Sequence, residues 1–233
     1  MISIIVPTLD EAANLRRLLP ALAADPEPHE TIVVDGGSRD DTRAVALAHG
    51  VRVIDAAPSR GGQIAAGAEA ARGDALWFLH ADTHPPTGAL AAIAATLAQH
   101  RHAPGGNFRL LFDGNRSFDR WLDGFYARLR RHGIYYGDSG VFVRTETYRA
   151  LGGMPKLALM EDFAFVRKLE RAGKTLCIAE PPLVTSSRRF EGRSRARIVA
   201  GWIAIHLLYA LGIDARALAR LYRSDRRTRC ARA

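Results

Sequence analysis

Apolar and polar positions alternate in blocks along the first half of the chain. Short apolar runs rich in β-branched and aromatic residues predict four strands, at Ile2–Val6, Thr31–Val34, Val51–Ile54 and Leu76–Leu79. The segments between them favour helices, because leucines recur at helical spacing from Leu15 to Leu22 and a Gly- and Ala-rich segment runs from about Gln63 to Gly73. This alternation predicts an α/β fold with a mostly parallel sheet flanked by helices.

The second half is less regular. It predicts further strands at Gly105–Phe112, Val141–Val143, Leu176–Ile178 and Leu183–Thr185, and helices at Ser117–Arg130 and Asp162–Arg171. No segment has the composition of a domain linker, so we expect a single domain over residues 1–190. Residues 191–233 contain the apolar run Ile198–Ile213 and form an expected helical tail.

Ligands of parallel sheets bind at the carboxyl ends of the strands, so the polar residues that follow each apolar run are the candidates for chemistry. They are Asp10, Glu11, Asp35, His80 and Asp82. Thr8–Glu11 and Ser38–Asp41 also have the pattern of helix capping boxes.

Asp35 ends a buried strand and precedes two glycines, which let a ligand approach the backbone closely. Its carboxylate can accept a hydrogen bond from the imide N–H of a uracil. The alternative is a turn residue that caps the next helix. Because Ser38 and Asp40 can provide that cap, we favour the ligand contact.

His80 and Asp82 follow the strand Leu76–Leu79, separated by Ala81. If the strand geometry continues, both side chains lie on one side and can hold Mn²⁺ or Mg²⁺ beside a diphosphate. Imidazole suits Mn²⁺ better. A core histidine beside a capping aspartate would give the same pattern.

Two further segments carry charge at predicted helix starts. Arg60, followed by Gly61 and Gly62, can bind a phosphate group at the helix start, although a plain turn accounts for this sequence equally well. Glu161 and Asp162 can complement a helix dipole or supply a general base for an acceptor hydroxyl.

The net charge of +9 lies entirely in the tail. Residues 1–187 hold 21 Lys and Arg against 21 Asp and Glu, whereas residues 188–233 hold 12 Arg against three acidic residues. A basic apolar segment of this kind is expected on an anionic membrane surface, in a homodimer interface, or as a solvated helix. The apolar run is shorter than a membrane span needs. With no visible leader and two distant cysteines, we expect a cytoplasmic protein, with a peripheral place on the inner face of the membrane left open.

Four segments in order resemble the motifs of family 2 glycosyltransferases of the GT-A fold. They are Ile2–Leu15 (ISIIVPTLDEAANL), Ile32–Thr42 (IVVDGGSRDDT), Gly73–Thr83 (GDALWFLHADT) and Gly152–Leu169 (GGMPKLALMEDFAFVRKL). The FLHADT version of the family's DxD motif is similar to that of a subgroup of small bacterial members. The resemblance covers about residues 1–190, and it implies a nucleotide half at 1–100 and an acceptor half at 101–190.

The resemblance also implies roles for individual residues. Asp35 would bind the base of a nucleotide-sugar donor, most simply a UDP-sugar, and Asp82 with His80 would hold the divalent metal. Asp162, beside Glu161, would be the base of an inverting displacement. The nucleotide would further contact a set of residues from the matching loops: Pro7, Thr8, Glu11, Arg60 and Ala81. Two departures from the pattern weaken the choice of uridine and of the ion, since Gly36 replaces an acidic residue and His80 replaces the first Asp of DxD.

Arg188 and Arg189 stand where processive relatives carry a QxxRW motif, and they either neutralise the departing diphosphate or form a basic surface cluster. The acceptor is unknown from sequence, with a lipid-linked molecule as one candidate. The main alternative is a non-catalytic nucleotide-sugar-binding protein. A sugar-1-phosphate nucleotidyltransferase is disfavoured because Pro7–Glu11 lacks glycine and basic residues. A nucleic-acid binder is disfavoured because no recognised module is present.

Overall fold

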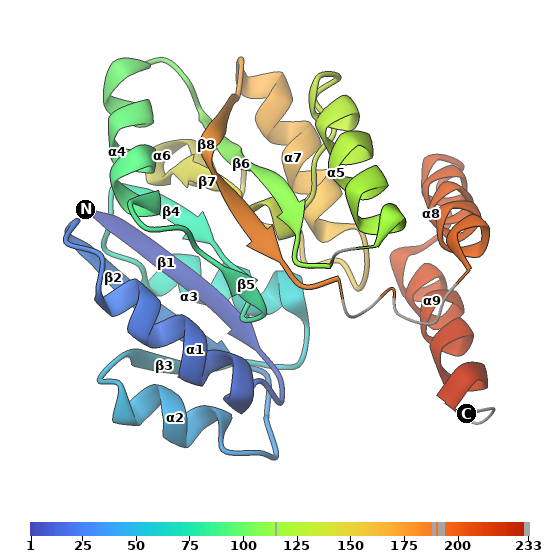
Figure 1. Cartoon of the computed structure of the whole chain (residues 1–233), viewed down its shortest axis with the longest axis horizontal. Helices are drawn as coiled ribbons and strands as arrows, with labels where there is room; N and C mark the ends of the chain where they lie inside the picture. The colour runs from blue at the N-terminus through green and yellow to red at the C-terminus, as the bar shows by residue number, and fades with distance from the viewer. Residues whose placement is uncertain (115, 188–189, 191–193, 231–233) are drawn as a thin grey trace.

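A computed structural model (Figure 1) describes residues 1–114, 116–187, 190 and 194–230, with side chains described up to residue 222. Its centre is an eight-stranded sheet in the order β3-β2-β1-β4-β7-β6-β8-β5. The strands are β1 (Ile2–Thr8), β2 (His29–Asp35), β3 (Arg52–Asp55), β4 (Ala75–Phe78), β5 (Thr83–His84), β6 (Gly105–Phe112), β7 (Phe142–Arg144) and β8 (Leu176–Thr185).

The sheet is mostly parallel, as the sequence predicts. β1 pairs in parallel with β2 and β4, β2 with β3, and β6 with β8. β7 joins the two parallel groups by running antiparallel to both β4 and β6, and β5 runs antiparallel to β8 at the edge. The α/β class with helices around the sheet is therefore confirmed.

Helices cover both faces of this sheet (Figure 1). They are α1 (Ala12–Ala23), α2 (Thr42–Ala48), α3 (Arg60–Ala70), α4 (Ala89–Gln99), α5 (Ser117–Arg130), the 3₁₀ turn η1 (Gly137–Ser139), α6 (Thr145–Ala150), α7 (Glu161–Ala172), α8 (Arg195–Ala210) and α9 (Ala215–Cys230). Side chains of α1 and α4 pack with Ile4 and Val6, whereas those of α3 and α7 pack with Ile5. The alternation of Ile4, Ile5 and Val6 along β1 thus separates two cores, each stabilised by about 1.5–3 kcal/mol per buried large side chain.

A third apolar cluster joins α5 to the tail. Phe118 and Leu122 of α5 are buried together with Phe190 and with Ile198 of α8. Trp202 of α8 stacks on Phe125 of α5 with ring centroids 6.4 Å apart. The tail therefore packs on the domain beside α5, although most of its surface stays outside the sheet layers (Figure 1).

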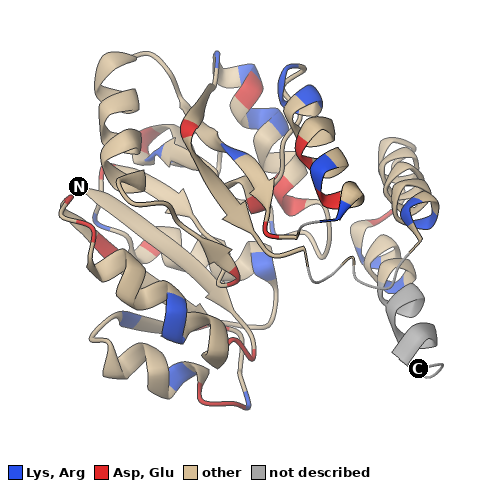
Figure 2. Cartoon of the chain, in the orientation of Figure 1, with Lys and Arg blue, Asp and Glu red and all other residues tan. Residues whose placement is uncertain are grey.

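The tail combines an uncharged stretch with basic ends. Figure 2 shows basic residues at the start of α8 and in the first part of α9, and α8 carries no Lys, Arg, Asp or Glu after Arg197. Gly212, at φ +83, turns the chain between the two helices. In the part of the chain that the structure describes, neither of these helices nor any other has the length and hydrophobicity to cross a membrane.

Several expected boundaries are wrong. The strands predicted at Leu176–Ile178 and Leu183–Thr185 are one continuous strand, β8, because both halves pair with β6 across an irregularity between Phe108 and Leu110. α3 begins at Arg60 rather than near Gln63, since the Ser59 hydroxyl accepts the Gly62 N–H.

The two capping boxes are also wrong. The N-cap residues Glu11 and Asp41 make no side-chain cap hydrogen bond. The polar groups of these loops instead bond to each other: Asp40 Oδ2 accepts the Ala12 N–H at 3.0 Å, and Asp10 Oδ1 accepts the Arg39 N–H at 2.7 Å. These hydrogen bonds join the loops after β1 and β2 at the carboxyl ends of the two strands, a region that we call the tied edge.

Candidate functional site

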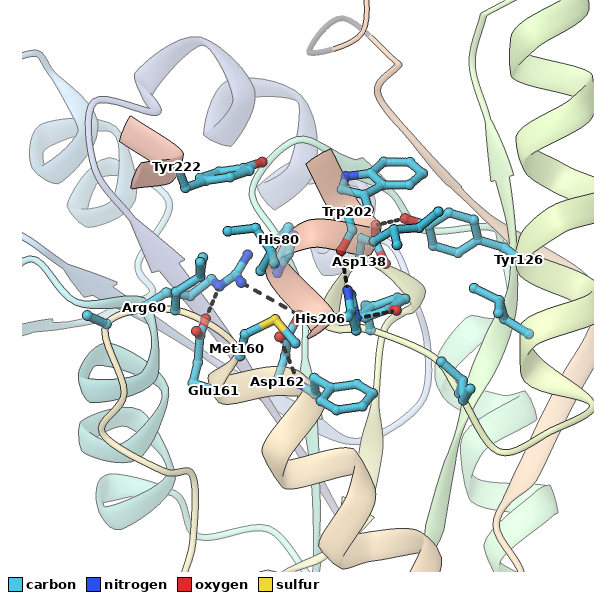
Figure 3. Close-up of a pocket in the computed structure, with 18 of the residues that line it drawn as sticks. Arg60, His80, Tyr126, Asp138, Met160, Glu161, Asp162, Trp202, His206 and Tyr222 are labelled. Atoms are coloured by element: carbon cyan, nitrogen blue, oxygen red, sulfur yellow. Dashed lines mark hydrogen bonds and ion pairs between the residues drawn. The ribbon is translucent and has the colours of Figure 1, made fainter. Parts of the chain in front are cut away.

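A cavity of about 730 Å³ lies between the sheet domain and the tail (Figure 3). Its polar end is formed by Arg60 at the start of α3, His80 after β4, Asp138 in η1, and Glu161 and Asp162 at the start of α7. Its remaining wall comes from α5, α7, α8 and Tyr222 of α9. Residues far apart in the sequence thus converge on one space, and four of the five residues at the polar end are sequence candidates.

The amino ends of α3 and α7 meet at this polar end. A side chain at Gly61 would place Cβ 2.6 Å from the Pro155 carbonyl oxygen and 3.1 Å from Glu161 Cβ. Glycine at 61 is therefore required for this close approach. It brings Arg60 Nε into an ion pair with Glu161 Oε1, and an Arg60 terminal nitrogen 3.6 Å from Asp162 Oδ2.

The Arg60 cation faces both carboxylates (Figure 3). The Glu161 side chain is only 3% exposed, and Arg60 is its ion-pair partner inside the protein. Loss of water around the guanidinium opposes its charge, but the negative charges of Asp162 and Glu161 outweigh this and raise the pKa of Arg60. Arg60 is thus a fixed cation at the polar end.

Asp162 is held as an ionised carboxylate. Its Oδ2 accepts the Gly137 N–H at 3.0 Å and its Oδ1 accepts the Phe163 N–H at 2.8 Å. Burial works against ionisation, but the charge of Arg60 and these two amide hydrogen bonds outweigh it and hold the pKa of Asp162 below its ordinary value. A deprotonated carboxylate directed into a cavity can accept a proton from a bound hydroxyl.

His80 lies next to this carboxylate. A Cβ on Gly137 would lie 3.3 Å from His80 Nε2 and 3.4 Å from Asp162 Oδ2, so both side chains border the space that this glycine leaves open. Desolvation, followed by the nearby charge of Arg60, lowers the pKa of His80 against the opposing effect of Asp82. The imidazole is therefore neutral at pH 7, the form that can ligate a metal ion.

The expected alignment of His80 with Asp82 along a strand is wrong, because β4 ends at Phe78. Residues 80–83 form a turn closed by a hydrogen bond from the Thr83 N–H to the His80 carbonyl. His80 lines the cavity whereas Asp82 does not. Among the described residues, no group of three or more His, Cys, Asp and Glu side chains is arranged to hold a metal ion. His80 and Asp82 can hold a metal ion only if phosphate oxygens and water complete its coordination shell.

The other candidate nucleotide residues lie at the tied edge of β1 and β2, outside the cavity lining. Gln63, buried in α3, donates from Nε2 to the carbonyl oxygens of Thr8 and Val34, at 2.8 Å each. Pro7 precedes Thr8 at the end of β1, and Glu11 follows in the loop, where it accepts a hydrogen bond from Asn14. Gln63 is a positioning residue that the sequence analysis treated only as the approximate start of a helix.

Asp35 forms hydrogen bonds within its own turn but does not cap the next helix, which begins at Thr42. Its carboxylate accepts hydrogen bonds from the backbone N–H groups of Gly37 and Ser38 and from the Ser38 hydroxyl. The side chain is buried, at 5% exposure of the residue. A contact with the base of a nucleotide stays a prediction, as it does for the buried Ala81 in the turn after β4.

Most of the cavity wall is absent from the sequence prediction of the site, including Asp138, Tyr136, Trp202 and His206. Asp138 is buried and accepts a 3.4 Å hydrogen bond from the Tyr126 hydroxyl. Its only local sequence signal is a polar turn between a helix and a strand. Trp202 and His206 stand in the apolar run of the tail, where sequence alone indicated a surface or interface helix. The candidate diphosphate residues Arg188 and Arg189 lie outside the described residues.

Comparisons with known proteins agree with this architecture. The model of the family described as glycosyl transferase family 2 matches residues 3–151. An uncharacterized glycosyltransferase of Mycobacterium tuberculosis and one of Mycobacterium bovis are each 32% identical over 97 residues, which is 41% of this chain and 43% of theirs. The matched segment thus spans less than half of the length of these curated relatives.

Solved structures share the fold at low sequence identity. A mannosyltransferase of Pyrobaculum calidifontis, solved with GDP-Man and Mn²⁺, is 19% identical with a TM-score of 0.67, covering 90% of this chain and 64% of that one. The glucosyl-3-phosphoglycerate synthase of Mycobacterium tuberculosis, solved with Mn²⁺, UDP and its glucosylated product, is 19% identical with a TM-score of 0.64, covering 91% and 80%. S. aureus TarS, solved with UDP-GlcNAc, is 18% identical with a TM-score of 0.64, covering 80% and 58%.

Proposed function

Because the chain belongs to glycosyltransferase family 2, we propose that it transfers a sugar from a UDP-linked donor to an acceptor hydroxyl with inversion at the anomeric carbon. The observation that carries this proposal is the ionised Asp162 carboxylate, which faces a cavity large enough for a substrate. Family membership makes the chain a transferase, so the alternative of a non-catalytic binding protein is dropped.

Asp162 is the general base of the proposed reaction. Its carboxylate accepts the proton of the acceptor hydroxyl while the acceptor oxygen bonds to the anomeric carbon. The bond from that carbon to the diphosphate oxygen breaks on the opposite face, so UDP leaves and the configuration inverts. The amides of Gly137 and Phe163 fix the carboxylate in one orientation, which reduces the entropic cost of reaching the reacting geometry.

Arg60 and Glu161 support this base in different ways. Arg60 is a cation at a helix start, with 40% of its side chain exposed to the cavity and solvent, and it can neutralise the donor diphosphate. Glu161 is buried against it and serves as a positioning residue that fixes the guanidinium. A diphosphate that attracts Arg60 would also reduce the influence of Arg60 on Asp162 and make that carboxylate a stronger base.

The donor nucleotide belongs at the edge where β1 and β2 end. Pro7, Thr8, Glu11 and Asp35 lie there, next to the tied loops. The hydrogen bonds of Gln63 to both strands keep this edge in place before the nucleotide arrives. The solved relatives with bound UDP or UDP-GlcNAc support the choice of donor, although their likeness to this chain is one of fold.

His80 and Asp82, with Ala81 between them, would hold Mn²⁺ or Mg²⁺ together with oxygens of the diphosphate. The bound ion would supply positive charge that stabilises the departing diphosphate. A neutral imidazole and one carboxylate favour Mn²⁺ over Mg²⁺, and Mn²⁺ is present in the solved mannosyltransferase and glucosyl-3-phosphoglycerate synthase.

Donor hydrolysis tests the proposal without an acceptor, because water then takes the acceptor's place. UDP-glucose, GDP-glucose and CDP-glucose are first compared by thermal shift with and without Mn²⁺. Saturation at a hundredfold excess over Kd would stabilise the fold by about 2.7 kcal/mol. NMR of the hydrolysis of an α-linked UDP-sugar then reports the first anomer released. Initial β-sugar supports inversion, whereas initial α-sugar or no stabilisation by any nucleotide-sugar contradicts the proposal.

A further inference from the structure

The cavity has an apolar end that the transfer of a sugar to a small polar acceptor leaves unused. Beyond the charged residues, its wall is made of side chains from three helices and the loop after α5: Phe125, Leu129, Ile134, Phe163, Trp202 and Leu207. The rings of this wall are held by one another, since Phe125 stacks on Trp202 and Phe163 packs on His206 with centroids 5.2 Å apart. An apolar wall of this extent favours an apolar ligand.

The polar group that interrupts this wall is already satisfied. His206 Nε2 and the Tyr136 hydroxyl are hydrogen-bonded at 2.9 Å, and His206 Nδ1 is 2.8 Å from the Trp202 carbonyl oxygen. Both ring nitrogens of His206 are therefore hydrogen-bonded within the protein, so this side chain needs no hydrogen bond from a ligand. The aromatic face of its ring can contact a hydrocarbon.

The apolar lining continues to the outer surface of α8. Ile203 and Leu207 both line the cavity and are still 55% and 59% exposed. A compact ring system would be enclosed by the inner wall and would leave these two side chains in water. A linear chain that starts at Asp162 would follow the inner wall and extend over Ile203 and Leu207.

We propose that the acceptor is an amphiphile, with its hydroxyl at Asp162 and a linear hydrocarbon chain in the apolar end of the cavity against α8. This inference rests on the proposed function, because that function places the reacting hydroxyl at Asp162. It gives the C-terminal helices a substrate-binding role, so that residues 195–210 belong to the acceptor site.

A brominated alcohol tests the apolar subsite directly. Bromine quenches tryptophan fluorescence on contact, and Trp202 lies in the wall. In a Trp121→Phe background, Trp77 is fully buried in the core and provides an unquenched reference. Undecanol with bromine at the far end of the chain should quench Trp202 saturably. Shorter bromoalkanols should bind more weakly, by about fourfold for each methylene removed, the equivalent of about 0.8 kcal/mol.

Two variants of exposed leucines distinguish binding in this subsite from non-specific hydrophobic binding to the surface of α8. Leu207→Gln should weaken binding of the bromo-undecanol by about four- to fifteenfold, the equivalent of one or two methylene contacts. Leu211→Gln, at a residue that is 78% exposed and outside the cavity lining, should leave binding unchanged. Both positions are exposed, so both variants should fold. Equal effects of the two variants, or quenching independent of chain length, would overturn the proposal.

A turnover assay then connects the subsite to the reaction. With UDP-glucose as donor, undecanol should release UDP faster than water alone and give an alkyl glucoside detectable by mass spectrometry, whereas butanol should not. Failure of UDP-glucose binding, with chain binding intact, would refute the proposed function and leave the apolar subsite standing. Donor binding and hydrolysis without any chain-length dependence would refute the amphiphilic acceptor alone.

Discussion

Replacement of Asp162 by asparagine removes the proposed base while keeping the shape of the side chain. The structure defines what the new amide meets. Both carboxylate oxygens accept a backbone N–H, from Gly137 at 3.0 Å and from Phe163 at 2.8 Å. An amide has one acceptor oxygen, so one of these N–H groups would face an NH₂ donor and lose its hydrogen bond.

Two magnitudes follow from this geometry. Loss of a general base should reduce the rate of transfer by about 10²–10⁴. Loss of one hydrogen bond to a charged group should lower the free energy of unfolding by about 1.5–3 kcal/mol. Arg60 keeps its ion pair with Glu161, so the cation for the donor remains. Affinity for the UDP-sugar should therefore stay close to that of the unchanged protein.

The assay combines donor hydrolysis by NMR with UDP titration and thermal unfolding. Asp74→Asn is the matched control, because Asp74 is 92% exposed and pairs only with the terminal amine among the ion pairs that the structure describes. The control should keep full rate and stability. If Asp162→Asn hydrolyses the donor within threefold of the unchanged protein, Asp162 is not the base, and the proposed mechanism fails.

Three further predictions concern charge. Arg60→Met should move the acid limb of the pH–rate profile of donor hydrolysis to higher pH, because the Asp162 carboxylate loses the cation that lowers its pKa. An acid limb at the same pH in both proteins would contradict this. Asp35→Ala should weaken UDP binding with or without EDTA, whereas the defect of Asp82→Ala should disappear when metal is chelated in both proteins; identical metal dependence of the two variants would contradict their separate roles. If the tail attaches to an anionic membrane, replacing Arg216 and Arg220, both exposed on α9, by glutamine should weaken the salt-sensitive binding to anionic vesicles by about 1 kcal/mol per residue, measured by co-sedimentation. A protein that does not bind vesicles and dimerises with rising concentration would favour the interface alternative.

Local periodicity predicted several elements closely. The strand Gly105–Phe112 and the helix Ser117–Arg130 were predicted with the boundaries that the structure has. β6 is buried over most of its length, and α5 buries Phe118, Leu122 and Tyr126 at helical spacing, so both patterns can be read locally. The two-residue strand β5 exists only through pairing of Thr83 and His84 with β8, about a hundred residues away. No local pattern encodes a contact of that kind.

The candidate site likewise combines residues that local sequence could predict with residues that only the tertiary structure brings together. Arg60, His80, Glu161 and Asp162 could be proposed from charge and position beside glycines or strand ends, and they do meet at one end of the cavity. Asp40 was expected to cap the next helix, and its Oδ1 does accept the N–H of Thr42 at the start of α2, but its Oδ2 also accepts the N–H of Ala12 at the start of α1. This second partner depends on how two loops lie in space. The apolar wall of the cavity was missed for a similar reason, because a helix that carries no charge after Arg197 gives no sign of which domain surface it covers.

Two adjacent residues connect the proposed base to the tail. The Gly137 N–H supports Asp162 Oδ2, and the hydroxyl of the preceding Tyr136 bonds to His206 of α8. A displacement of α8 by an incoming molecule would therefore be transmitted through a single peptide to the proton affinity of the base. By thermodynamic linkage, the protonation state of Asp162 must then alter affinity for that molecule by the same factor. Acceptor recognition and proton transfer would in that case be one coupled equilibrium, measurable as a pH dependence of binding in the absence of any donor.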